Sequence, residues 1–368
     1  MNVLHVLAPV AFGGGESLLV SLLRERRPGL RESVALLYSS TAFERELAEL
    51  GIRCYRLGSK GIGYGASKWR VAADIASHLQ ALIPLQRLVV ASGTDVVHAH
   101  GYPASLLFYL LRLQKSAIRG VYTHHSFRRP PNGLEMLVLP RVYGAFDVCT
   151  GVSGAVCSSM ERAFPSLAGR FRTVYNCVDG SFYEAAQRRR RQTGHVARFI
   201  QIARFVPSKK QAQVVHSLAR LDQSERSRVR VVFVGDGPER AGVERLAAGK
   251  GLSRHVSFLG HVPHSRVPDL LAHADFGLFP CEGEGFGIAA AECLAAGLPV
   301  LSLNTEVMAE VIGPAGVRVS ADRLHEGFSR MLEVGPELRG AALEQAEQFR
   351  VGRVKDQYTR CYEQAASR

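Results

Sequence analysis

Short runs of β-branched and aromatic residues alternate with amphipathic stretches, and the alternation occurs in two series. In the first half, five runs are expected to be buried strands: Val3–Leu7, Val34–Tyr38, Val96–Ala99, Gly120–Thr123 and Val148–Val152. Five more follow in the second half: Arg198–Ala203, Val229–Val234, Val256–Leu259, Asp275–Leu278 and Pro299–Leu303. Strands separated by helical segments in this way are typical of parallel sheets covered by helices on both faces.

A polar, arginine-rich segment at residues 179–194, containing EAAQRRRRQTG, interrupts this pattern near the middle of the chain. A length of 368 residues is enough for two domains with separate cores. We predict one Rossmann-like domain over residues 1–185, a second over 186–345, and a C-terminal helix over 346–368 that packs back toward the first. Ligands of open α/β sheets bind at the carboxyl ends of strands, so we expect the site in the loops there, in a cleft between the domains.

The composition is that of a soluble globular protein, with 46% hydrophobic and 21% charged residues. No apolar run is long enough to cross a bilayer, and MNVLHVLAPV does not have the form of a secretory signal. The seven cysteines are scattered and form no C-x-x-C pair, which favours reduced thiols over disulfides or a zinc site. These features predict a cytoplasmic protein.

A formal charge of +13 favours anionic partners such as nucleic acid, acidic lipid headgroups or phosphorylated substrates, although a merely solvated surface explains any single basic cluster equally well. No helix-turn-helix, aromatic RNA-binding strand or zinc-finger spacing accompanies the charge, so a nucleic-acid-binding protein is the weaker alternative. No G-x-G-x-x-G follows the first strand of either half, which disfavours a dinucleotide oxidoreductase.

The most informative stretch is Glu282–Leu298, EGEGFGIAAAECLAAGL, which places one carboxylate in a glycine-rich loop and another in an apolar run. Glu292 is the only charged side chain between Phe286 and Leu298, and a helix that is apolar all round is normally buried. A buried carboxylate is costly unless something hydrogen-bonds or pairs with it. Glu292 is therefore either a structural oddity or a ligand-binding group.

We expect Glu284 in the loop and Glu292 more than a turn inside the helix, with its side chain directed back toward the helix start. Backbone amides of the loop can then meet a phosphate, while the two carboxylates accept hydrogen bonds from hydroxyls on either side. The amides are those of Gly285, Phe286 and Gly287. A nucleotide sugar, in which sugar hydroxyls flank a diphosphate, fits these demands.

A second candidate loop follows the expected strand Arg198–Ala203 and carries Arg204 and Lys209. Ser208 and Gln211 have the spacing of a capping box, which predicts a helix starting at Lys209. Cations are unfavourable at a helix N-terminus unless an anion such as a diphosphate binds there. The turn Gly235–Pro238 after the next strand is a weaker signal, because glycine turns commonly only connect elements.

Glu284, seven intervening residues and Glu292, within EGFGIAAAECLAAGLPVL, resemble the signature of the retaining glycosyltransferases of family 4, which have the GT-B fold of two Rossmann-like domains facing across a cleft. IARFVPSKK, VFVGDGPE and VSFLGHV are similar to the family's diphosphate clamp, glycine turn and nucleobase segment. Gly13–Glu16, DVVHAH and VSGAV also match. The sequence departs from the family at Lys210, where glycine is usual.

The resemblance implies a role for each matching residue. Arg204 and Lys209 would neutralise the leaving diphosphate in place of a metal, in agreement with the absence of an Asp-x-Asp motif. Glu292 would hold the ribose hydroxyls and Glu284 the hydroxyls of the donor sugar. Gly14 would let the backbone approach the diphosphate from the first domain.

The family also carries a histidine near the anomeric centre, after a strand of the first domain. Aligning on Thr123 favours His125 over His124 for this position. His98 and His100 lie at another strand end, where we favour structural hydrogen bonding over catalysis.

By this resemblance the chain is a retaining glycosyltransferase that moves a sugar from a UDP- or GDP-linked donor to a hydroxyl acceptor in polysaccharide or glycolipid assembly. No cofactor or metal is expected beyond the donor, and no nucleic acid. Basic and aromatic residues of the first domain favour a lipid-linked or anionic acceptor and peripheral contact with an anionic membrane at the inner face of the cell membrane. The loops expected to select the acceptor are Gly58–Lys68 and Arg128–Pro140. Non-hydrolysing sugar-nucleotide epimerases share the fold and stay an alternative, although the first domain shows no second carboxylate cluster suited to them.

Overall fold

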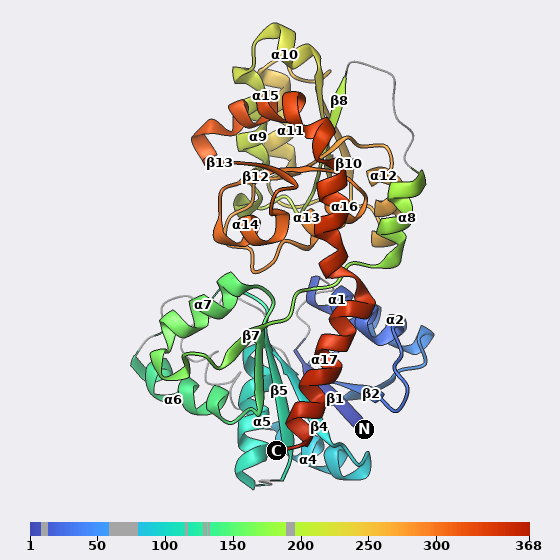
Figure 1. Cartoon of the computed structure of the whole chain (residues 1–368), viewed down its shortest axis with the longest axis vertical. Coiled ribbons are helices and arrows are strands. Elements are labelled where there is room, and N and C mark those ends of the chain that lie inside the picture. Colours follow the sequence, from blue (N-terminus) through green and yellow to red (C-terminus); the bar gives the residue numbers. More distant parts are fainter. Residues whose placement is uncertain (9–13, 59–79, 115–116, 128–130, 132, 189–195) are drawn as a thin grey trace. The chain divides into compact units, whose positions relative to one another are not determined.

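The computed structural model describes residues 1–8, 14–58, 80–114, 117–127, 131, 133–188 and 196–368 (Figure 1). The chain divides into two compact units. The first unit comprises Met1–Cys177 together with Val351–Arg368, and the second comprises Val178–Arg350. Each unit is built on its own parallel sheet.

In the first unit the described residues form a seven-stranded parallel sheet with the order β3-β2-β1-β4-β5-β6-β7. The strands are β1 (Asn2–Leu7), β2 (Arg31–Leu36), β3 (Arg53–Arg56), β4 (Val96–His100), β5 (Arg119–His124), β6 (Val148–Gly151) and β7 (Phe171–Thr173). The helices are α1 (Gly14–Arg24), α2 (Thr41–Glu49), α4 (Leu82–Ala91), α5 (Gly101–Gln114), α6 (Gly133–Gly144), α7 (Gly154–Ala163) and α17 (Val351–Ala366).

Alternate residues of these strands pack into separate apolar cores on the two faces of the sheet, because successive side chains along a strand point to opposite faces. Leu4 and Tyr122 belong to the core under α5 and α6. Val3 and Val121 belong to the core that α17 covers, where Tyr358 and Tyr362 are buried. The long C-terminal helix is thus an integral layer of the first unit.

The second unit contains a six-stranded parallel sheet within the described residues, with the order β10-β9-β8-β11-β12-β13. The strands are β8 (Ala197–Ile202), β9 (Val229–Val234), β10 (Val256–Gly260), β11 (Phe276–Phe279), β12 (Val300–Leu303) and β13 (Gly316–Val319). The helices are α8 (Gly180–Arg188), α9 (Gln211–Arg220), α10 (Gln223–Ser227), α11 (Arg240–Gly249), α12 (Val267–Leu271), α13 (Ile288–Ala295), α14 (Glu306–Ile312), α15 (Leu324–Val334) and α16 (Arg339–Ala346).

Two parallel-sheet, Rossmann-like domains confirm the predicted fold class. All ten predicted strands are present, with β2 beginning three residues earlier than expected. The sequence pattern missed β3, β7 and β13, which are edge strands. Edge strands need no continuous apolar run because one of their sides lacks a neighbouring strand.

The units divide at residues 177/178 and 350/351, whereas the sequence placed the boundaries at 185/186 and 345/346. The first difference arises because α8 packs against α12 and α13 and so belongs to the second unit. The second arises because the short helical segment Glu347–Phe349 still packs with α16. No helix among the described residues is both long enough and apolar enough to cross a bilayer.

Candidate active site

The loops after β8 and β11 bring two of the predicted site residues into direct contact. Lys209 Nζ forms an ion pair with Glu284 Oε1, and the two side chains are 20% and 30% exposed. Glu284 lies in the glycine-rich loop, as the sequence predicted. A predicted phosphate-binding cation and a predicted sugar-binding carboxylate therefore occupy one place at the carboxyl edge of the sheet, where ligands of such sheets bind.

The connection from β8 to α9 differs from the prediction. The predicted capping box at Ser208 is wrong: Pro207–Lys209 form a 3-10 turn, and α9 begins at Gln211 with no side-chain cap. Lys210 interrupts the helix because it adopts the left-handed conformation, with a φ of 59°. The Gln211 side chain instead donates to the carbonyl oxygen of Arg204 at 3.0 Å.

The backbone of residues 203–210, between β8 and α9, is held from two sides, and we call this segment the clamp loop. Gln201 Nε2 of β8 donates to the carbonyl oxygen of Lys209 at 2.7 Å, and Gln201 is buried. The amide of Phe205 donates to the carbonyl oxygen of Asp236 in the glycine turn at 2.9 Å. These bonds fix the position of the Lys209 backbone, so the freedom of this residue is in its side chain.

Gly235 and Gly237 are required by the close approach of the clamp loop. A Cβ atom at Gly235 would lie 2.1 Å from the carbonyl oxygen of Ala203, and one at Gly237 would lie 2.5 Å from that of Phe205. Both glycines have positive φ angles, 131° and 155°. The turn therefore supports the loop that carries Arg204 and Lys209.

Arg204 itself is exposed, and it has no ion-pair partner among the residues that the structure describes. Its guanidinium is therefore available to an anion at this edge of the sheet. Five fixed N–H donors on a planar group suit the oxygens of a phosphate.

The loop after β11 ends in a left-handed glycine that starts α13. Gly287 has a φ of 84°, and a Cβ atom there would lie 2.7 Å from Met308 Cε. Phe286 is buried and meets the ring of Phe349 edge-on at 5.2 Å. Gly285 is buried as well. The loop is thus anchored by packing, and the start of α13 brings backbone N–H groups to the same edge of the sheet.

Glu292, the fifth residue of α13, is 6% exposed and has a partner that the sequence did not reveal. His264 Nε2 lies 2.7 Å from Glu292 Oε1, and His264 is about half exposed. The ring of Phe182 lies 5.3 Å from that of His264. His264 closely follows the segment VSFLGHV, and this proximity was the available signal.

In the first unit the structure separates the two neighbouring histidines after Thr123. His124 is buried and its Nδ1 lies 2.7 Å from Tyr122 OH, inside the core. His125 lies just beyond β5, is partly buried, and its Nε2 lies 3.2 Å from His100 Nδ1. Burial lowers the pKa of His125 to about 4, so its ring is neutral at neutral pH.

His98 makes the structural hydrogen bonds that we predicted. Its Nδ1 lies 2.9 Å from Tyr362 OH and its Nε2 lies 2.7 Å from Thr123 Oγ1. Among the described residues, nitrogen atoms of His5, His98 and His100 lie within 4.8 Å of one another, close enough to consider a metal ion. Hydroxyl groups already occupy both nitrogens of His98, so this donor set fits a hydrogen-bonded cluster better than a metal site.

Gly14 is the first residue of α1, the helix start that the sequence predicted, while Gly13 lies outside the described residues. Most of Gly58–Lys68, part of Arg128–Pro140 and the arginines at 189–191 also lie outside them. The structure therefore describes the predicted donor-site residues within each unit, but only part of the predicted acceptor loops.

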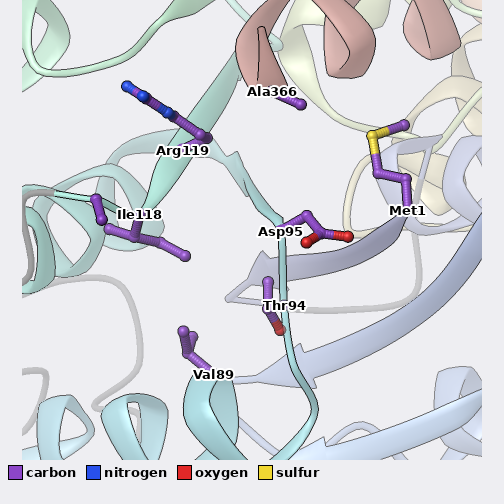
Figure 2. Close-up of a pocket in the computed structure, with 8 residues that line it drawn as sticks. Met1, Val89, Thr94, Asp95, Ile118, Arg119 and Ala366 are labelled. Atoms are coloured by element: carbon purple, nitrogen blue, oxygen red, sulfur yellow. The ribbon is translucent and has the colours of Figure 1, made fainter. Parts of the chain in front are cut away.

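A pocket in the first unit lies at the opposite edge of its sheet (Figure 2). Met1, Asp95 and Arg119, which line it, stand at the amino ends of β1, β4 and β5. It contains none of the predicted site residues. Because ligands of such sheets bind at the carboxyl ends, this pocket does not mark the active site.

Two family models match the chain. The one described as glycosyltransferase family 4 matches residues 13–182, and the one described as glycosyl transferases group 1 matches residues 185–349. Over 216 residues the chain is 30% identical to a GDP-mannose-dependent alpha-(1-6)-phosphatidylinositol monomannoside mannosyltransferase of Mycobacterium tuberculosis. That match covers 53% of this chain and 55% of the relative, so the chain spans about half the length of this curated relative.

Solved structures agree on the fold. Anabaena HepE in complex with UDP and glucose is 19% identical, with a TM-score of 0.77 over 99% of both chains. A glycosyltransferase from Rickettsia africae is 16% identical, with a TM-score of 0.79 over 99% of this chain and 98% of that one. The two family matches, one for each half, together with the two parallel-sheet domains, show that the chain belongs to glycosyltransferase family 4 and has the GT-B fold.

Proposed function

We propose that this protein is a retaining glycosyltransferase that moves a sugar from a nucleotide-diphosphate donor to a hydroxyl group. The observation that carries the proposal is the contact between Lys209 and Glu284 at the carboxyl edge of the second sheet. Arg204 belongs to the same loop as Lys209, and Glu292 to the helix that follows Glu284. The loop after β8 thus contributes two cations suited to phosphate. The loop after β11 and helix α13 contribute two carboxylates suited to hydroxyl groups.

In this proposal Arg204 and Lys209 stabilise the leaving diphosphate. Cleavage of the bond between sugar and phosphate increases the negative charge on the leaving oxygen and gives the sugar oxocarbenium character. Preorganised cations and the N-terminus of α13 lower the energy of that charge, by several kcal/mol in comparable sites. The two cations supply the positive charge that a divalent metal supplies elsewhere, so we propose a reaction without metal or cofactor.

Glu292 would hold the ribose and Glu284 the donor sugar. A ribose hydroxyl that donates to Glu292 would replace the contact with His264, and a sugar hydroxyl that donates to Glu284 would release Lys209 toward the phosphate. Backbone amides of Gly285, Phe286 and Gly287 would help to place the sugar and the phosphate. Ligand binding would thereby exchange two internal contacts for two contacts with the donor.

Retention of configuration needs no side-chain nucleophile if the reaction occurs on one face of the sugar. The departing phosphate oxygen would accept the proton of the acceptor hydroxyl as the new bond forms. His125 of the first unit would accept or donate a hydrogen bond at the donor sugar, and Gly14 would let the start of α1 approach the diphosphate.

The acceptor side of the proposal rests on two observations. The mycobacterial relative is named for a phosphatidylinositol mannoside acceptor, and this chain carries a net charge of +13. Both favour an anionic or lipid-linked acceptor in glycolipid or polysaccharide assembly, with a cytoplasmic protein at the inner face of an anionic membrane. Flotation with anionic and neutral vesicles tests this part, and equal absence from both would contradict it.

A donor screen tests the central proposal. UDP-, GDP- and ADP-linked sugars would be compared by thermal shift and by nucleotide release, and one series should stabilise the wild-type protein. Glu292→Ala and Lys209→Ala should each weaken the effect of that donor. Lys250→Ala is the matched control, because Lys250 is exposed at the end of α11, at the amino edge of the sheet.

If neither Glu292→Ala nor Lys209→Ala changes the binding of any nucleotide sugar, the proposed site is wrong. The configuration of the product, determined by NMR, tests retention separately: an inverted linkage would contradict that part. Isomerisation of the donor sugar without transfer would instead identify an epimerase.

A further inference from the structure

The face of the first sheet that α17 covers changes from apolar to polar toward the carboxyl ends of its strands. Val3, Val96, Val121 and Val148 belong to one apolar cluster on β1, β4, β5 and β6. Two residues later, and so on the same face, these strands carry His5, His98, Thr123 and Thr150. All four of these polar residues are buried. The large majority of buried polar groups in proteins are hydrogen-bonded, so the partners of these four residues have to be identified.

The hydrogen bonds of these four residues follow two separate routes. His98 and the threonines bond among themselves and to the tyrosines of α17. His5 instead lies on a line that leads out of the core: its Nε2 is 3.2 Å from Glu32 Oε1, and its Nδ1 is 3.1 Å from His100 Nε2. His100 Nδ1 is in turn 3.2 Å from His125 Nε2. We call Glu32, His5, His100 and His125 the histidine relay.

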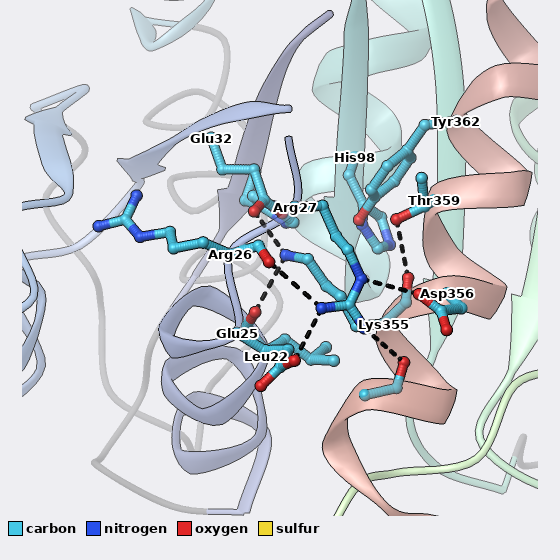
Figure 3. Close-up of polar contacts among 12 residues, drawn as sticks. Leu22, Glu25, Arg26, Arg27, Glu32, His98, Lys355, Asp356, Thr359 and Tyr362 are labelled. Atoms are coloured by element: carbon cyan, nitrogen blue, oxygen red, sulfur yellow. Dashed lines mark hydrogen bonds and ion pairs between the residues drawn. The ribbon is translucent and has the colours of Figure 1, made fainter. Parts of the chain in front are cut away.

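Lys355 anchors the inner end of this relay (Figure 3). It extends from α17, pairs with Glu32 and donates to the carbonyl oxygen of Leu22 at 2.9 Å. The side chains of Lys355 and Glu32 are 1% and 3% exposed. Burial opposes ionisation of Glu32, but the hydrogen bond from His5 and the charge and hydrogen bond of Lys355 outweigh it and lower the pKa of Glu32. The inner end is therefore a buried carboxylate that can only accept hydrogen bonds.

The direction of every hydrogen bond follows from that carboxylate. Glu32 can only accept, so His5 must carry its proton on Nε2. A neutral His5 then accepts at Nδ1, so His100 must donate from Nε2. A neutral His100 accepts at Nδ1, so His125 must donate from Nε2. Burial lowers the pKa of His5 and of His100, which keeps both rings neutral and so keeps the direction uniform.

We propose that Glu32, acting through His5 and His100, holds His125 in the tautomer that keeps its proton on Nε2 and leaves the Nδ1 lone pair available to a hydroxyl of the substrate. Among the described residues, Nδ1 of His125 has no hydrogen-bond partner. Glu32, His5 and His100 are positioning residues in this scheme. The link to substrate rests on the function proposed above for His125, whereas the tautomer itself does not.

The tautomer is measured directly by NMR. In the full-length protein labelled with 15N-histidine, two-bond correlations between ring nitrogens and ring protons distinguish Nε2–H, Nδ1–H and doubly protonated rings. The resonances are assigned with single histidine variants. We expect His5, His100 and His125 all to carry the proton on Nε2 at neutral pH. A proton on Nδ1 of His125, or rapid averaging between its tautomers, would overturn the proposal.

Glu32→Gln should reverse the relay. Lys355 donates only, so the new amide must turn its oxygen toward Lys355 and its NH2 group toward His5. His5 Nε2 then becomes the acceptor, and each following ring has to move its proton to Nδ1, including that of His125. An unchanged His125 tautomer in a folded Glu32→Gln protein would contradict the relay.

Variants of His100 test whether the relay sets the tautomer of His125, even if Glu32→Gln does not fold. His100→Gln retains one donor and one acceptor and should preserve the Nε2–H form of His125. His100→Leu removes the acceptor for that proton, so His125 should no longer be held in the Nε2–H form. Donor turnover should fall about tenfold to a hundredfold in His100→Leu, by analogy with the loss of a hydrogen-bond partner that orients a metal-bound histidine, while the affinity for nucleotide stays unchanged. His98→Gln, on the same strand but outside the relay, should retain turnover.

The two proposals fail in different ways. If His125→Ala leaves turnover unchanged, the role of His125 in the reaction is wrong, while the NMR result still decides the relay. If His100→Gln and His100→Leu lose turnover equally, the relay does not position His125. A titration with zinc, followed by the same NMR experiment, tests the alternative of a metal site. Stoichiometric binding that shifts the ring nitrogens of His5, His98 and His100 together would make this cluster a metal site and overturn the relay.

Discussion

Lys209 and Glu284 form an ion pair, although we expect the first to bind phosphate and the second to bind sugar hydroxyls. Both side chains are partly exposed, and a pair of this kind contributes little to the stability of the fold. The contact therefore adds little to the fold, and we assign it a role only within the proposed donor site. In the absence of a donor, it neutralises two charges that a donor would engage separately.

Glu284→Gln should separate binding of the nucleotide from transfer of the sugar. Without the competing carboxylate, Lys209 is free for phosphate, so free nucleoside diphosphate should bind as tightly as in the wild type or more tightly. Turnover should nevertheless fall by roughly 10²-fold or more, because a charged acceptor for the sugar hydroxyls is lost. Isothermal titration with UDP or GDP and steady-state kinetics with the donor would measure both effects.

Glu282→Gln is the matched control for that variant. Glu282 belongs to the same loop but pairs with Lys210, at 3.1 Å, and about half of its side chain is exposed. Glu282→Gln should leave the affinity for nucleotide and the turnover close to those of the wild type. Weaker nucleotide binding in Glu284→Gln would show that Glu284 does not compete for Lys209.

Lys210→Gly should stabilise the protein relative to Lys210→Ala by about 1 kcal/mol, because only the glycine relieves the left-handed conformation. Both variants lose the same half-exposed ion pair with Glu282, so their difference isolates the backbone. The greater freedom of glycine in the unfolded chain offsets part of the gain. Urea unfolding followed by circular dichroism would give the two midpoints, and equal midpoints would contradict the assigned conformation.

Lys210 also shows which part of the site could be predicted. The resemblance to the family indicated that glycine is usual at this position, but not why. The structure supplies the physical reason: the chain turns through a left-handed residue before α9. The capping-box prediction failed at the same place, because spacing alone cannot show that Pro207 and Lys210 divide the segment into a 3-10 turn and a separate helix.

Hydrogen-bond partners that are distant in the sequence could not be predicted from it either. The isolation of Glu292 in an apolar run predicted a buried carboxylate that needs a partner, and this is confirmed. The partner, His264, lies in another loop of the second unit and was not predicted. In the first unit, strand ends were predicted at His100 and near His125, but their connection through His5 to Glu32 depends on strand order. Sequence patterns identify which residues lie at an edge of the sheet, whereas pairwise contacts across that edge require the fold.

His264→Ala should destabilise the nucleotide-free protein by about 1 kcal/mol. It leaves the buried Glu292 carboxylate without its hydrogen bond, and the half-exposed position of His264 reduces the cost. Nucleotide should restore part of the loss if ribose hydroxyls replace His264 at Glu292, so its thermal shift should be at least as large as in the wild type. A smaller thermal shift, similar to that of Glu292→Ala, would make His264 a nucleotide contact instead of a competitor.

Stability should fall on acidification between about pH 6.5 and pH 4, through the buried histidines of the first unit. Burial lowers the pKa of His125 from 6.5 to about 4, and it also lowers the pKa values of His5, His98 and His100. Across this window the unfolded chain binds more protons than the folded chain, so the free energy of unfolding rises with pH and is lost as pH falls. Each such histidine contributes up to about 1.4 kcal/mol per pH unit.

Urea unfolding of the wild type and of His100→Gln at pH 7, 6 and 5 would measure this dependence. His100→Gln removes one titrating ring while retaining a donor and an acceptor for its neighbours, so its free energy of unfolding should depend less steeply on pH, by close to one proton. Glu32 does not produce the same result, because its lowered pKa affects stability only below its ordinary value of 4.5. A slope equal to that of the wild type would mean that His100 titrates alike in the folded and unfolded chains, and its burial between His5 and His125 would then be wrong.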